Sequence, residues 1–162
     1  MKSSTKEDIK AEISIIKKSV KRIFIPSEVR NLLSLSSQYK NVIKDRMSNE
    51  KKINTLLDIL LVCSSYQERA VSIDTTLRRL KSKSEKLNNL LRREFNSDDS
   101  FVKLKKKEQT CILDAELGPF LDLENNIKRK VEIMEKVVDH LREAGYTLRT
   151  VVSALKVKHE VT

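Results

Sequence analysis

Only two glycines and two prolines interrupt this chain of 162 residues. Tight turns in β-rich folds depend on these residue types, because glycine supplies positive φ angles and proline presets a turn geometry. The chain therefore has little means of building many hairpins. Leu, Ile, Lys, Glu, Arg and Ser dominate the composition, and aromatic residues make up 4% of it. This composition is typical of long helices, and we expect an all-α fold, an elongated bundle of long helices.

Apolar residues recur at helical spacing in the N-terminal part of the chain. One alternation of four- and three-residue steps is formed by Ile9, Ile13, Ile16, Val20 and Ile23. This spacing predicts an amphipathic helix over residues 9–23. Pro26 is expected to end it, since proline lacks an amide hydrogen and disfavours helix in the residue before it. Ser27 is then expected to be the N-cap of a second helix, with Glu28 in its first turn.

Three breaks are expected after the start of the second helix. The apolar spacing weakens at residues 45–49, and a long helical pattern then runs over residues 53–91. The polar run at residues 96–100 predicts a loop, because short polar side chains compete for backbone hydrogen bonds. A helix is expected to resume near Phe101. The Gly-Pro pair at 118–119 predicts a further turn or kink before the last helix.

The last helix, expected over residues 120–156, carries a heptad pattern of four- and three-residue steps. Two structures produce such a pattern: a helix packed inside one chain's bundle, or a seam between subunits. The low aromatic content favours the seam, because a small helical monomer needs much core from elsewhere. Gly145 either ends the helix or allows two helices to approach closely. We expect a homo-oligomer whose contact residues are Ile127, Val131, Met134, Val138, Leu141 and Leu148.

Residues that usually carry chemistry are scarce in this sequence. Cys63 and Cys111 lie far apart, and we expect both to be reduced thiols. Neither histidine has metal-ligand spacing with a cysteine, and glycine is too scarce for a phosphate-binding loop. We therefore expect a protein that is not an enzyme and that has no cofactor and no metal site.

Charge is distributed unevenly along the chain. The sequence holds 33 Lys and Arg against 23 Asp and Glu, a net charge of +10. Residues 1–46 carry +6 and the window 78–107 carries +7, whereas residues 99–162 carry +1. Such an imbalance favours nucleic acid, anionic lipid or an acidic protein as the partner.

The basic window predicts one continuous helical face. Steps of four, three and seven residues separate Arg79, Lys83, Lys86 and Arg93. Their side chains share a face about 20 Å long at the helical rise of 1.5 Å per residue. Further basic residues around the polar loop are expected to converge with this face: Arg92, Lys103, Lys105, Lys106 and Lys107. Cationic groups presented along one surface bind phosphates with release of counterions.

Phe95 and Phe101 flank the polar loop. They either stack on unpaired bases or fill the core at a corner between helices. Proteins that read duplex DNA usually show a recognition helix after a tight turn, and the sequence contains no such pattern. We therefore expect the basic residues named above to bind single-stranded DNA without sequence preference.

Three stretches occur in the order VSIDTTLRRLKSKSEKLNNLLRREFNSDD, KKEQTCILDAELGPFL and LREAGYTLRTV. The first is a long helix that ends in a basic segment, an aromatic residue and a polar loop. In order and spacing the three resemble the UvsY family, the recombination mediators of T-even-like phages. The resemblance covers about residues 47–158. We therefore divide the chain into a basic helical extension, residues 1–46, and a mediator-like domain, residues 47–162.

The resemblance implies a homo-oligomer that binds single-stranded DNA and assembles through its C-terminal helix. Such a protein helps to load a recombinase onto DNA coated by single-strand-binding protein, in recombination and repair. The family's basic pair before the aromatic loop corresponds here to Leu90 and Arg92, so only Arg92 keeps the charge. The family's loop glycines and its long-helix tryptophan have no counterpart in this sequence.

Two alternatives belong to other classes of function. A helical structural or adaptor subunit could use the basic surface to bind an acidic protein partner. A membrane-surface protein could use the amphipathic helix at residues 9–23. The N-terminus lacks the apolar core of a secretory signal, and the longest apolar run is too short for a membrane span. We therefore expect a cytoplasmic protein without a membrane partner, located in the host cytoplasm if a phage encodes it.

Overall fold

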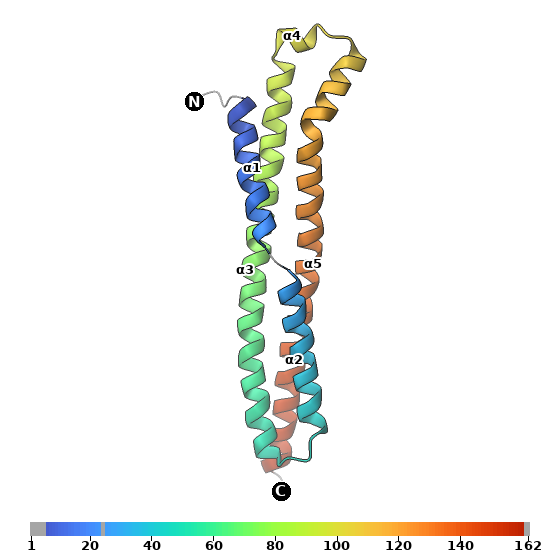
Figure 1. Ribbon diagram of the computed structural model, residues 1–162. Coiled ribbons are helices and arrows are strands. Elements are labelled where there is room, and N and C mark those ends of the chain that lie inside the picture. Colours follow the sequence, from blue (N-terminus) through green and yellow to red (C-terminus); the bar gives the residue numbers. More distant parts are fainter. Residues whose placement is uncertain (1–5, 24, 161–162) are drawn as a thin grey trace, which may run out of the picture. The chain divides into compact units, whose positions relative to one another are not determined.

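The computed structural model describes residues 6–23 and 25–160, and all of its elements are helices. In chain order these are α1 (Lys6–Arg22), α2 (Pro26–Lys44), α3 (Asn49–Asn96), α4 (Asp99–Val102) and α5 (Lys106–Glu160), as Figure 1 shows. No strand occurs among the residues described. The expected all-α fold is confirmed.

The chain forms two compact units, and each contains segments that are distant in sequence. Unit 1 comprises Met1–Ile23 and Thr75–Val131, and it holds α1, the second half of α3, α4 and the first half of α5. Unit 2 comprises Phe24–Asp74 and Glu132–Thr162, and it holds α2 with the other halves of α3 and α5. Both units take residues from either side of position 46, and the division expected there stays a prediction.

In unit 1, α1 is held by its apolar stripe and by ion pairs at its edges. The predicted stripe is buried at Ile9, Ile13, Ile16 and Val20. Lys10 pairs with Glu116 of α5, and Lys83 of α3 pairs with Glu12. Lys130 Nζ donates to the carbonyl oxygens of Val20 and Ile23 at 2.9 and 2.6 Å. A cation at the C-terminal end of a helix stabilises the unpaired carbonyls there, and burial lowers the pKa of Lys130.

In unit 2, α3 and α5 approach closely at a glycine. Cys63 Sγ of α3 donates to the Leu141 carbonyl of α5 at 3.4 Å, and a Cβ built on Gly145 would lie 3.8 Å from the same sulfur. Gly145 lies inside α5 and does not end it. Of the two roles expected for this glycine, close approach of two helices is therefore the one that the structure confirms.

The junction between α1 and α2 differs from the expectation. Pro26 is the first residue of α2, and Ile25 occupies the N-cap position without a side-chain cap. Ser27 is therefore not the N-cap; its hydroxyl donates to Glu28 Oε1 at 3.2 Å. Proline is tolerated in the first turn of a helix because the amide there has no intrahelical partner. Glu28 lies in that first turn as expected, buried, with Arg69 Nε 2.9 Å from its carboxylate.

The breaks after α3 also differ in part. The break near residues 45–49 is confirmed, whereas the loop predicted at 96–100 is shorter, since α3 ends at Asn96 and α4 begins at Asp99. The helix expected to resume near Phe101 is only the short α4, and a second break follows at residues 103–105. Of the turn or kink expected at 118–119, the turn is wrong, since α5 continues through Pro119, and the kink stays a prediction. Gly118 has no Cβ to clash with the proline ring, and this removes the main steric objection to a helical residue before proline.

The heptad residues expected to form a seam between subunits lie in the core of the single chain. Their exposed fractions run from 0 to 7%, at Ile127, Val131, Met134, Val138, Leu141 and Leu148. The structure thus corresponds to the bundle alternative, and these side chains present no apolar surface to a partner. Self-association of the protein stays a prediction, and it requires another surface.

The apolar face of α1 is likewise occupied, because Ile9, Ile13 and Ile16 are buried within the protein. In this structure that face is not available to a lipid surface. None of the helices in the described ranges is long and apolar enough to cross a membrane.

Two substitutions on α5 distinguish a core residue from a surface residue. Val138→Asp places a carboxylate at a position that is 6% exposed, and we expect it to lower the free energy of unfolding by more than about 3 kcal/mol. Ile133→Asp, at a position that is 43% exposed, should change that free energy by less than about 1 kcal/mol. Urea denaturation followed by circular dichroism measures both. A Val138→Asp protein of unchanged stability and lower mass would instead support a subunit seam.

Replacing each of the two glycines of α5 by alanine should change the free energy of unfolding differently. Gly145→Ala adds a methyl group at ordinary contact distance from Cys63 and should raise the free energy of unfolding by about 1 kcal/mol, the helix-propensity difference. Gly118→Ala meets no neighbouring atom within 4 Å, but its Cβ crowds the ring of Pro119. We expect the second variant to gain less or to lose stability, and equal gains would contradict this explanation of the continuous helix.

Candidate nucleic-acid interface

Nearly all of the positive charge belongs to unit 1. Its two segments hold 21 Lys and Arg against 12 Asp and Glu, a net charge of +9. The segments of unit 2 hold 12 against 11, a net charge of +1. A polyanion is therefore attracted to unit 1 far more strongly than to unit 2.

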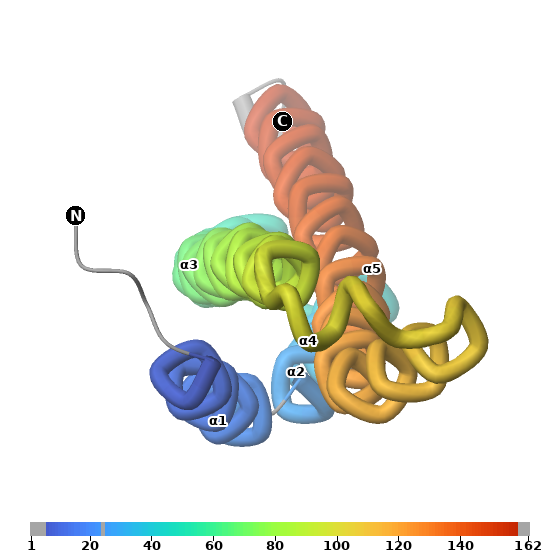
Figure 2. The backbone as a smooth tube through the Cα atoms, turned by 90° about the horizontal axis from the view of Figure 1, so that it is seen from above, coloured from blue at the N-terminus to red at the C-terminus, as the bar shows by residue number. Residues whose placement is uncertain are grey.

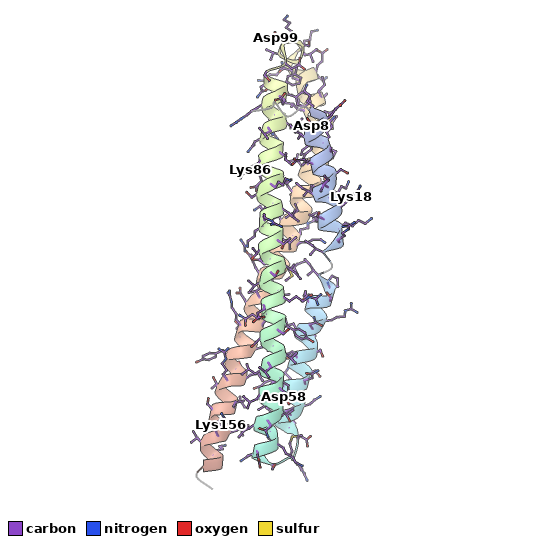
Figure 3. All side chains as sticks on the ribbon, turned by 90° about the vertical axis from the view of Figure 1, so that its left-hand side faces the viewer. Asp8, Lys18, Asp58, Lys86, Asp99 and Lys156 are labelled. Atoms are coloured by element: carbon purple, nitrogen blue, oxygen red, sulfur yellow. The ribbon has the colours of Figure 1, made fainter. Side chains whose placement is uncertain are left out.

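Four basic residues form what we call the α3 rail. They lie on one face of the second half of α3, and all four are exposed: Arg79, Lys83, Lys86 and Arg93. The packing of unit 1 explains this exposure, because the leucines at 77, 87 and 91 are buried and turn the other faces of α3 outward. Lys86 lies on the side of α3 that is turned away from α1 (Figure 3).

Most of the rail is not neutralised within the chain. Lys83 Nζ lies 3.1 Å from Glu12 Oε2, and both side chains are about half exposed. Such a surface pair contributes less than about 1 kcal/mol and is easily exchanged for another anion. Among the residues that the structure describes, Arg79, Lys86 and Arg93 make no ion pair. Three of the four cations are thus available to phosphate groups.

A shallow depression lies between two cations of the rail. It has a volume of about 310 Å³ and is lined by Lys86, Asn89, Leu90 and Arg93. Leu90 is 41% exposed and forms its apolar part. One apolar side chain and one amide between two cations suit a nucleotide, whose base is largely apolar on its faces and whose two flanking phosphates are anionic.

Arg92 does not lie on the rail. At 100° per residue it projects about 135° around α3 from the middle of the rail. Its Nε donates to Asn88 Oδ1 at 3.3 Å, and Asn88 Nδ2 donates to Glu124 Oε1 of α5 at 3.2 Å. Asn88 is only 7% exposed, so Arg92 supports a buried polar link between α3 and α5. Its side chain is still exposed, but the expected convergence with the rail is not found.

The lysines after the loop form a separate group, which we call the tip lysines. They are all exposed: Lys103, Lys105, Lys106 and Lys107. The short helix α4 and the turn after it carry the chain away from the end of α3 before α5 begins (Figure 1, Figure 2). The tip lysines therefore do not extend the rail directly, although both groups belong to unit 1.

The phenylalanines beside the loop belong to the core. Phe95 and Phe101 are 6% and 7% exposed, and their ring centroids lie 5.2 Å apart at an interplanar angle of 52°. Lys6 Nζ lies 4.2 Å from the centroid of Phe95, a cation–π contact. Of the two alternatives for these rings, packing in the core is confirmed, and neither ring is available to stack on a base.

The loop itself is ordered by Asp98. Its carboxylate caps α4 by accepting the amides of Ser100 and Phe101, and it forms an ion pair with Lys6 at 3.0 Å. The hydrogen bond from Lys6 and the two amide donors hold the pKa of Asp98 below its usual value. The polar loop is thus a capping structure that ties α1 to the end of α3.

Sequence reasoning missed two features of this region. Leu90 falls on the same helical face as the rail, and this apolar residue among cations was the available signal for the depression. The link from Asn88 to Glu124 had no such signal, because only the packing of α3 against α5 brings the two residues together. The described part of the chain contains no group of three or more side chains that could hold a metal ion.

Comparisons with known proteins add no family to this description. No protein-family model matches the sequence, and no curated protein and no solved structure matches it.

Proposed function

We propose that unit 1 binds single-stranded DNA along the α3 rail. The observation that carries this proposal is the exposed face of α3, where three of four cations lack an intrachain partner in the described structure. Unit 1 carries +9 of the chain's net charge of +10, and this supports the proposal further. Binding of this kind depends on phosphate contacts and counterion release, and it needs no bond chemistry.

The depression at Leu90 favours an unpaired strand over a duplex. In a duplex the bases are stacked and paired, and a shallow depression on a straight helix cannot reach their faces. In a single strand a base can turn toward Leu90 while its flanking phosphates contact Lys86 and Arg93. Because both aromatic rings near the loop are buried, this apolar contact takes the place of aromatic stacking.

The biological role in the proposal comes from the resemblance to the UvsY family. In that role the protein helps to load a recombinase onto DNA coated by single-strand-binding protein. We include self-association, because sites on several linked subunits bind a long strand with avidity. The contact surface must lie outside the six heptad residues, which are buried in the single chain.

Removal of two rail charges should change both affinity and salt dependence. Lys86→Gln with Arg93→Gln should weaken binding of an oligothymidylate. It should also make the slope of log affinity against log salt concentration less steep by about 1.4, since each single-strand phosphate contact contributes about 0.7. Fluorescence anisotropy at several salt concentrations measures both quantities.

The matched control removes two charges from unit 2. Lys51→Gln with Lys156→Gln lowers the net charge equally at exposed positions, and it should leave the slope unchanged. Equal losses in both double variants, or a parent protein whose affinity does not depend on salt, would contradict binding of the strand along the α3 rail.

A third variant should increase binding. Glu12→Gln removes the ion-pair partner of Lys83, and its affinity for the oligothymidylate should be about threefold higher than that of the control variant Glu50→Gln in unit 2.

A further inference from the structure

The turn between α4 and α5 is fixed by its own hydrogen bonds. Gln109 Nε2 donates to the carbonyl oxygens of Phe101 and Val102, both at 3.1 Å. Glu108 Oε2 accepts the amide of Lys105 at 3.1 Å, as in half of a capping box. Phe101, just before the turn, is anchored in the core. The conformation of residues 103–105 is therefore set before any partner binds.

This fixed turn presents apolar side chains to solvent. Val102 is 55% exposed and Leu104 is 36% exposed. A groove of about 460 Å³ lies beside the turn, lined by Leu104, Lys107, Glu108, Cys111 and Ile112. Leu104 and Cys111 are exposed and Ile112 is half-buried, and exposed apolar grooves with a polar rim commonly mark interaction sites.

The surroundings of the groove are strongly cationic. The tip lysines place four ammonium groups within five residues, and Glu108 is the nearest acid in the sequence. Over the stretch of chain that the structure describes, no tip lysine forms an ion pair through its side chain. A partner that complements this surface carries several carboxylates or phosphates together with one apolar group.

We propose that this groove binds an acidic peptide segment, with one aliphatic side chain of the peptide between Leu104 and Ile112 and its carboxylates on the tip lysines. A peptide fits better than a nucleic acid, because the groove is lined by two aliphatic side chains, Leu104 and Ile112, and by no amide side chain such as that of Asn89 in the depression at Leu90. The amide of Gln109 that could read a base edge is already used in the turn. The groove lies apart from the α3 rail, so a strand and a peptide can be bound together.

The proposal can be tested with a fluorescein-labelled peptide that has Asp and Glu on both sides of a single Leu. We expect saturable binding by anisotropy, and at least a tenfold loss when Ser replaces that Leu, because a buried leucine side chain contributes that much affinity. Equal affinity of the two peptides would contradict binding of the leucine in the groove, because charge attraction alone would then explain the binding.

Cys111 provides a second, independent readout inside the groove. It is exposed, whereas Cys63 is buried and burial raises the pKa of its thiol. N-ethylmaleimide should therefore modify Cys111 first. Saturating peptide should slow this modification at least fivefold. Unchanged modification would place the peptide elsewhere, and slowing by an oligothymidylate but not by the peptide would identify a nucleic-acid site.

Matched variants separate the groove from its surroundings. Leu104→Ser should abolish protection of Cys111, whereas Val102→Ser, an exposed position outside the groove lining, should preserve it. Lys107→Gln should likewise lower the affinity for the peptide more than Lys128→Gln does, at an exposed position of unit 1 outside the groove and the tip lysines. Equal effects within either pair would contradict the proposal. Circular dichroism melting of each variant identifies any loss that arises from unfolding.

Discussion

Burial of one leucine face of α3 determines which residues of unit 1 remain in solvent. Leu77 and Leu91 are fully buried, and Leu87 nearly so. A helix can bury only part of its circumference against two neighbours, so the rail residues are necessarily turned outward. The same packing brings Asn88 to Glu124 and therefore separates Arg92 from the rail. Position within the helical turn, more than position along the chain, decides which cations act together.

The two units also differ in their charge. In unit 1 basic residues outnumber acidic ones by 21 to 12, whereas in unit 2 the charges nearly cancel. Unit 2 instead contains an ion pair of the buried Glu28 with the exposed Arg69, and the close contact between Cys63 and Gly145. These features serve packing and offer no surface to a polyanion. The two units thus share helices but have different surfaces.

The sequence predicted the features that depend on local periodicity and missed those that depend on what lies across a helix. The apolar stripe of α1 was found because its spacing is a local property. A heptad pattern is the same for a core helix and for a subunit seam, so periodicity could not place Val138. Proline likewise signals the end of one helix or the first turn of the next, and Pro26 belongs to the second class.

The central claim is that a single strand contacts the exposed face of α3 in unit 1. Lysine acetylation, measured by mass spectrometry with and without an oligothymidylate, tests it most directly because each lysine reports separately. A strand bound on the α3 rail should slow acetylation of Lys86 severalfold and leave that of Lys156 in unit 2 unchanged. Equal slowing at Lys86 and Lys156, or no slowing at Lys86 when the strand is saturating, would contradict it.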